Sequence, residues 1–228
     1  MSQYRFFRPF VGQLYNSGCG IYSKRIMILI YAISSFNDTN YDDCMICAKG
    51  NKMASHKVRI TGKRYQIQNL SMQDGLVYAI KEKTLTFRNL SKIIASIIGT
   101  TNYEETWKYL SCTVYCQSIL FAAQFRHSPV FKPNLMQDDF NTFIETIKEL
   151  QPHIIIACGS FIHTPIKDNE YVCNKEIQDE TLGYICYIRI PEVFHTITII
   201  NSYHPSSPAW YIELKKTQQF IKNELNKR

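Results

Sequence analysis

Residues 149–160, ELQPHIIIACGS, contain the pattern that decides the fold. Apolar residues at helical spacing predict a helix that begins at Asp138 or Asp139 and ends at Leu150. Pro152 follows the helix, and the run HIIIAC (residues 153–158) is typical of a strand buried on both faces. Gly159 closes that strand. A helix, a tight turn, a β-branched strand and a glycine form half of a unit of a doubly wound parallel sheet.

The rest of the chain continues this alternation of strands and helices. Thr86 is predicted to cap a helix that runs to about Ile98, with Gly99 as its stop. Asn102 and Glu105 have the spacing of a capping box for a short helix that extends to about residue 110. The region 58–80 is ambiguous between helix and strand. The other expected elements are strands at 25–31, 111–115, 184–189 and 196–200 and a last helix at 208–225.

These elements predict the α/β class, as a three-layer α/β/α sandwich around a central, mostly parallel sheet. We expect one domain over residues 1–228, with an irregular N-terminal third. In such sheets, ligands bind beyond the carboxyl ends of the strands. The loops after Tyr31, Cys158 and Ile200 are therefore expected to line any site.

Charge is distributed unevenly along the chain. The first 64 residues contain ten Lys and Arg against three Asp, so they carry the whole net charge of +7. Such an excess suits an acidic partner, and DNA is the partner that we expect. A solvated basic surface would give the same composition.

The sequence also predicts the compartment. No apolar run approaches the roughly 20 residues that a membrane span needs, and Arg5 and Arg8 interrupt the N-terminal apolar residues before a signal sequence can form. We therefore expect a cytoplasmic protein without a membrane partner. Its eight cysteines are expected to be mostly reduced, because a chain of this length does not need disulfides for its stability.

The segment 201–208, NSYHPSSP, is the strongest candidate for a functional site. A strand ends there, and a short loop leads directly into a helix. Pro205 stiffens the loop, while Ser206 or Ser207 can cap the helix, whose N-terminus favours an anion such as phosphate. This arrangement places His204 at the edge of the sheet where ligands bind.

The HPSS sequence after a strand is similar to the second active-site motif of the uracil-DNA glycosylase superfamily. The run ELQPHIIIACGSFI resembles the helix, proline, buried strand and glycine of its core. The block EETWKYLSCTVYCQ resembles its central strand, and FRPFVGQLYNSG followed by KRIMIL resembles the start of a poorly characterised branch. Together, these pieces cover roughly two-thirds of the chain.

The resemblance implies hydrolysis of the N-glycosidic bond of a base flipped out of DNA. His204 would stabilise the departing base, and Asp38 would orient the attacking water. The remaining site residues that we assign to this reaction are Phe36 and Gln117 for the base and Ser160, Ser206 and Ser207 for DNA phosphates. No cofactor or metal is expected, and we expect a monomer.

Two departures from the superfamily leave other functions open. Ile33 stands where a polar residue is expected, and Val114 stands near the position of the base-reading Asn. A catalytically impaired member of the same fold, which binds nucleic acid or a protein, is the main alternative. An α/β enzyme that acts on small molecules or nucleotides is a further one. His204, Phe36 and Asp38 would then be helix-entry, packing and turn residues, respectively.

The cysteines offer two more readings. Cys44 and Cys47, with Cys112 and Cys116, could form a metal or iron–sulfur site, but the second pair falls on a predicted strand. Cys158 could be a nucleophile beside a histidine. We interpret it as a buried residue at a strand end, because no feature of the sequence would lower the pKa of its thiol.

Overall fold

The computed structural model describes twelve segments of the chain. They are residues 9–20, 22–30, 34–35, 56–60, 63–67, 85–115, 121–122, 133–159, 166, 169–179, 183–205 and 208–227. The folded core lies in these segments, and the candidate loop reaches into them as far as Pro205.

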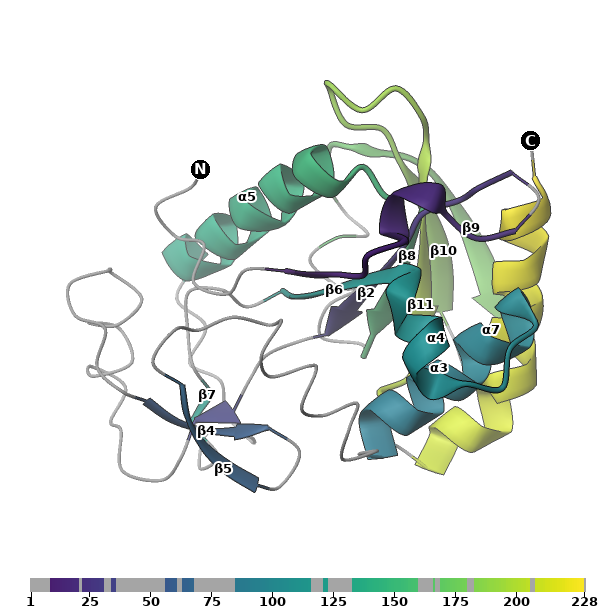
Figure 1. The fold of residues 1–228 in the computed structure, drawn as a ribbon. Helices are drawn as coiled ribbons and strands as arrows, with labels where there is room; N and C mark the ends of the chain where they lie inside the picture. Colours follow the sequence, from purple (N-terminus) through teal and green to yellow (C-terminus); the bar gives the residue numbers. More distant parts are fainter. Residues whose placement is uncertain are drawn as a thin grey trace.

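A seven-stranded mixed sheet forms the centre of the molecule (Figure 1). Its four middle strands are parallel, and its edges are antiparallel. In spatial order the strands are β1 (Phe10–Val11), β6 (Leu110–Val114), β2 (Ile26–Ile30), β8 (Ile154–Cys158), β11 (Ile197–Ser202), β10 (Gly183–Ile188) and β9 (Val172–Asp179).

The parallel strands are doubly wound. The chain forms β2 first, adds β6 on one side of it, and then crosses to add β8 and β11 on the other side. The winding therefore changes direction between β2 and β8. In sheets of this kind the switch point opens a crevice at the carboxyl ends of the strands, where ligands bind.

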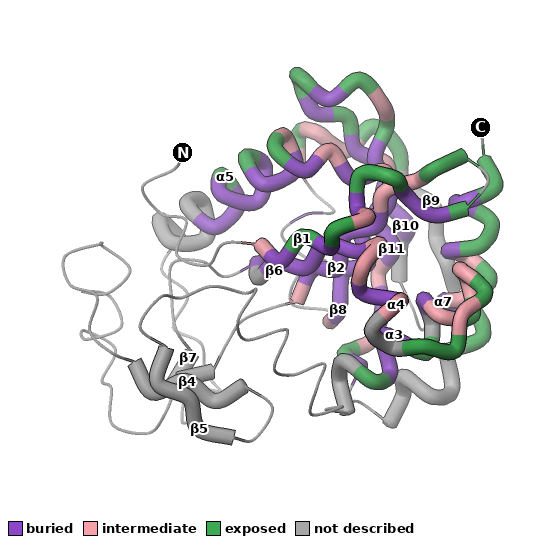
Figure 2. The backbone as a smooth tube through the Cα atoms, in the orientation of Figure 1, coloured by how far each residue is buried: buried purple, intermediate pink, exposed green. Residues whose placement is uncertain are grey.

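Helices cover both faces of this sheet. On one face, α3 (Leu85–Ile98), α4 (Tyr103–Lys108) and α7 (Pro208–Asn226) contribute to one buried apolar cluster with the sheet. On the other face, α5 (Pro133–Leu150) packs through an aromatic and aliphatic stripe that includes Phe143 and Ile147. Figure 2 shows that burial is concentrated in the middle strands and on the inner sides of the helices. The middle strands consist mainly of apolar residues. This is expected, because helices cover them on both faces and both faces therefore contact the core.

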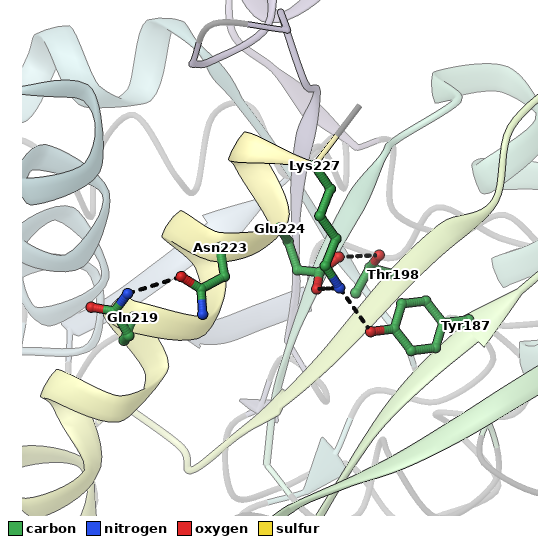
Figure 3. A network of polar contacts seen from close by, with 6 residues as sticks. All are labelled: Tyr187, Thr198, Gln219, Asn223, Glu224 and Lys227. Atoms are coloured by element: carbon green, nitrogen blue, oxygen red, sulfur yellow. Dashed lines mark hydrogen bonds and ion pairs between the residues drawn. The ribbon is translucent and has the colours of Figure 1, made fainter.

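A polar network around the buried carboxylate of Glu224 fixes the end of α7 to the sheet (Figure 3). The carboxylate of Glu224 accepts a hydrogen bond of 3.0 Å from the Thr198 hydroxyl on β11 and pairs with Lys227. Lys227 also donates to the hydroxyl of Tyr187 on β10, at 3.2 Å. Glu224 is only 6% exposed, so these partners compensate for the water that its carboxylate loses on folding.

A smaller four-stranded sheet follows the carboxyl ends of β2 and β6 in the chain. In it β3 (Ser34–Ser35) pairs in parallel with β7 (Phe121–Ala122) and antiparallel with β4 (His56–Ile60), which forms a hairpin with β5 (Lys63–Ile67). The ambiguous region 58–80 is therefore strand where the structure describes it. Part of the expected loop after Tyr31 is strand as well.

The sequence predicted most of the larger sheet correctly. The predicted strands at 25–31, 111–115, 184–189 and 196–200 correspond to β2, β6, β10 and β11 within two residues. Gly99 follows α3 with a positive φ of 75°, and the backbone N–H of Glu105 donates to the Asn102 side chain at 3.4 Å. The α/β class is thus confirmed, with a mixed sheet whose middle strands are parallel, whereas its antiparallel edges were not predicted.

Three predicted boundaries were wrong. Helix α5 begins at Pro133, five or six residues before Asp138 or Asp139, because proline is well tolerated in a first helical turn. Thr86 lies inside α3 instead of capping it. The short helix α4 ends at Lys108, because the chain then enters β6 at Leu110. None of the helices in the described segments is both long and apolar enough to cross a membrane.

Candidate active site

Three parallel strands end together at the edge of the sheet that carries the candidate site. The register pairs Ile30 of β2 with Cys158 of β8, and Cys158 with Ser202 of β11. The N–H of Gly159 donates to the carbonyl of Ser202 at 2.8 Å, which joins β8 and β11 at their last residues. The segments that leave these strands therefore start side by side, as the sequence predicted.

The loop after β11 is held on both sides of His204. Tyr203 is partly buried and packs against the apolar cluster that α3 and α7 share with the sheet. Pro205 is buried, and its carbonyl accepts a hydrogen bond of 2.6 Å from the side-chain amide of Asn89 on α3. Anchors before and after His204 restrict the backbone from which its imidazole projects.

His204 itself is exposed at this edge. Protein atoms around the ring nevertheless remove enough water to lower the pKa of its imidazole, because desolvation disfavours the charged form. The ring is therefore neutral at pH 7. A neutral imidazole can donate one hydrogen bond to an oxygen that gains negative charge, and it needs no prior protonation to do so.

The other predicted site residues cannot be located relative to His204. Asp38, Phe36, Gln117, Ser160, Ser206 and Ser207 lie outside the described residues, as does Ile33. Val114 is the last residue of β6, and it pairs with Ile30 of β2. The position at which the resemblance calls for an Asn is thus at the same edge of the sheet as His204.

The described cysteines have the properties of core residues. Cys158 is fully buried, and burial raises the pKa of its thiol to about 12, which excludes a thiolate nucleophile at neutral pH. Cys112 is also fully buried, and its thiol pKa is raised by burial and by the neighbouring Cys158. Within the described segments, no group of three or more potential metal ligands comes together. Cys44, Cys47 and Cys116 lie outside them.

The amino ends of the parallel strands, opposite to the candidate site, carry a histidine pair that the sequence did not predict. His153 and His195 stack with ring centroids 4.0 Å apart and an interplanar angle of 9°. The Nδ1 of His153 accepts a hydrogen bond of 3.1 Å from the backbone N–H of Arg25, and the Nε2 of His195 donates to the Pro152 carbonyl at 2.9 Å. Because these residues precede β2, β8 and β11, the pair lies at the amino ends of the strands.

The comparisons with known proteins add no family assignment. No protein-family model matches the chain, and no curated protein sequence matches it either. The geometry of the strand ends and the chemistry of His204 therefore support the functional proposal by themselves.

Proposed function

We propose that this protein is a DNA glycosylase of the uracil-DNA glycosylase type, built as a three-layer α/β/α sandwich, that hydrolyses the N-glycosidic bond of a flipped-out base. One observation carries the proposal. The HPSS loop, which contains His204, leaves β11 at the same edge of the sheet as the ends of β2 and β8, and these two strands flank the switch point where ligands bind in a doubly wound sheet.

The reaction assigned to this edge is hydrolysis at the sugar carbon. The bond from C1′ to the base nitrogen breaks, the base leaves with the bonding electron pair, and water supplies the oxygen that bonds to C1′. His204, neutral because of its lowered pKa, donates a hydrogen bond to the base oxygen on which charge collects. Asp38 is the residue assigned to orient the attacking water, and the proton that this water loses neutralises the departing base.

Two features support DNA as the substrate. Helix α7 begins directly after the HPSS loop, so its N-terminal N–H groups lie at the same edge and favour phosphate, with Ser206 and Ser207 as further donors. The whole positive excess of the chain falls within its first 64 residues. A net positive charge favours the approach of an anionic substrate such as DNA.

The direct test uses single- and double-stranded oligonucleotides that contain uracil or another deaminated base. After incubation with the protein, alkali cleaves the strand wherever a base has been removed. We expect cleavage by the wild type and about a hundred-fold slower cleavage by His204→Gln, as for loss of one donor to a developing anion. The matched control is His195→Gln, which changes the same residue type at the other end of β11 and should retain the activity.

Absence of cleavage at every deaminated base, with DNA binding intact, would reject the glycosylase and leave the second candidate. That candidate is a non-catalytic DNA-binding protein of the same fold. It is favoured by Val114, the last residue of β6, because valine has no side-chain group that can hydrogen-bond a base. For either function, DNA affinity should fall as salt rises, since phosphate contacts release counterions. An affinity independent of salt would argue against phosphate contacts.

A further inference from the structure

The HPSS loop is held by a residue far from it in sequence. The side-chain amide of Asn89 donates to the carbonyl of Pro205 at 2.6 Å, across a separation of 116 residues. Both residues are buried, and Asn89 is only 1% exposed. The hydrogen bond therefore links helix α3 to Pro205, the residue that directly follows His204.

An amide at this place in α3 needs an explanation. Its neighbour Leu90 and, one turn later, Ile94 are fully buried in the apolar cluster beside the sheet. A buried amide is unfavourable there unless its polar atoms are paired, and asparagine is also a poorer helix former than leucine or alanine. The contact with the Pro205 carbonyl compensates for this disadvantage, and it also satisfies a loop carbonyl that is shielded from water.

We propose that Asn89 is a positioning residue for His204. It does not touch the substrate; it fixes the carbonyl of Pro205 while Tyr203 packs on the core, so that the backbone of His204 is held from both sides. Catalytic groups need such support, because a small displacement of the reacting group slows the chemical step strongly. The catalytic part of this inference rests on the proposed function, whereas the positioning itself does not.

The test compares Asn89→Leu and Asn89→Ala with a control on the same helix. Ser91 is also buried, and its hydroxyl accepts a hydrogen bond of 2.7 Å from Trp107 Nε1, so Ser91→Ala removes a similar buried contact that does not touch the loop. The primary measurement is an NMR titration of the His204 imidazole in protein without DNA, assigned by comparison with His204→Gln. In both Asn89 variants the pKa of His204 should rise toward 6.5, because a loosened loop admits water, while Ser91→Ala leaves it unchanged.

Base excision provides the second measurement. We expect kcat to fall about tenfold to a hundred-fold in the Asn89 variants with little change in KM, and Ser91→Ala to stay within about twofold of the wild type. If the wild type excises no base, the proposed function fails, but the titration still tests the positioning. An unchanged His204 pKa in a folded Asn89 variant overturns the inference. So does loss of the fold in both Asn89 variants, since Asn89 would then be a purely structural residue.

Discussion

The stacked histidines at the amino edge of the sheet make the stability of this protein depend on pH. The pKa of His153 is lowered to about 4 by burial of the ring, by the charge of His195 when protonated, and by the cations Arg25 and Lys24. The geometry adds a reason. The Nδ1 of His153 accepts the backbone N–H of Arg25 at 3.1 Å, and the added proton of an imidazolium would occupy that same nitrogen.

The direction of the pH dependence of stability follows from the pKa values of His153 in the unfolded and in the folded protein. In the unfolded chain the imidazole takes up a proton near pH 6.5, whereas the folded protein resists it down to about pH 4. Between these values the unfolded state binds more protons, so stability is fully present above about pH 6.5 and is lost as the pH falls toward 4. The full difference between the two pKa values corresponds to about 3 kcal/mol in the free energy of unfolding, and about 2 kcal/mol of this is lost by pH 5.0. Because the ring keeps some contact with water, we expect about 1 to 2 kcal/mol.

The perturbation is His153→Asn, whose side-chain oxygen can still accept the N–H of Arg25 but does not titrate. Urea unfolding, followed by the fluorescence of the buried Trp107, gives the free energy of unfolding at pH 7.5 and at pH 5.0. The wild type should lose about 1 to 2 kcal/mol more than His153→Asn between these two pH values. His195→Asn should show an intermediate loss, because it removes the coulombic effect of His195 that helps to lower the pKa of His153.

Phe194 provides a control beside this pair. It is 96% exposed, so Phe194→Ser should change neither the stability nor its dependence on pH. Equal losses for the wild type and His153→Asn would show that His153 titrates normally in the folded protein. The hydrogen bond to Arg25 and the burial of the ring would then not set its pKa.

Two further substitutions test the packing at the amino ends of the strands, away from the candidate site. Gly12→Ala should lower the free energy of unfolding by about 3 kcal/mol, because a Cβ at this position would lie 2.3 Å from the backbone carbonyl oxygens of Trp107 and Lys108. Glu224→Ala should lower it by about 2 kcal/mol, because the Thr198 hydroxyl loses its buried acceptor. Both values can be measured by urea unfolding at pH 7.5.

Matched controls separate these effects from general sensitivity to mutation. A Cβ at Gly99 would meet no atom within 4 Å, so Gly99→Ala should lower the stability by only about 1 kcal/mol, from its positive φ. Gln219 on α7 donates to Asn223 at the surface (Figure 3), and Gln219→Ala should change the stability by less than about 0.5 kcal/mol. Equal effects for a buried variant and its control would contradict the corresponding argument.

How far the sequence predicts this fold depends on how strongly each element is buried. The strands β2 and β8 are apolar throughout, and the sequence located both. It did not locate β9, whose residues VCNKEIQD are mostly polar, because β9 is an edge strand that pairs only with β10 within the sheet. The order of the strands also escaped prediction, since many orders satisfy the same alternation of helices and strands.

The candidate site could likewise be predicted only in part. Local sequence placed His204 at a strand end before a helix, because the pattern of strand, HPSS loop and helix is contiguous. The contact of Asn89 with Pro205 and the stack of His153 on His195 join residues far apart in the chain. No local periodicity distinguishes Asn89 from a solvated helix residue or His153 from a strand-entry residue. Such contacts appear only when the tertiary structure brings the elements together.

The two histidines that flank β11 show why the carboxyl edge is the better candidate for chemistry. His195 precedes the strand, and its ring is hydrogen-bonded to the carbonyl of Pro152 and stacks on the ring of His153. His204 follows the strand and is exposed on a loop whose backbone is anchored by Asn89. A catalytic imidazole needs a fixed backbone together with an accessible ring, and His204 combines these two properties whereas His195 does not. If His195→Gln slowed base excision as much as His204→Gln, this distinction between the two edges would be wrong.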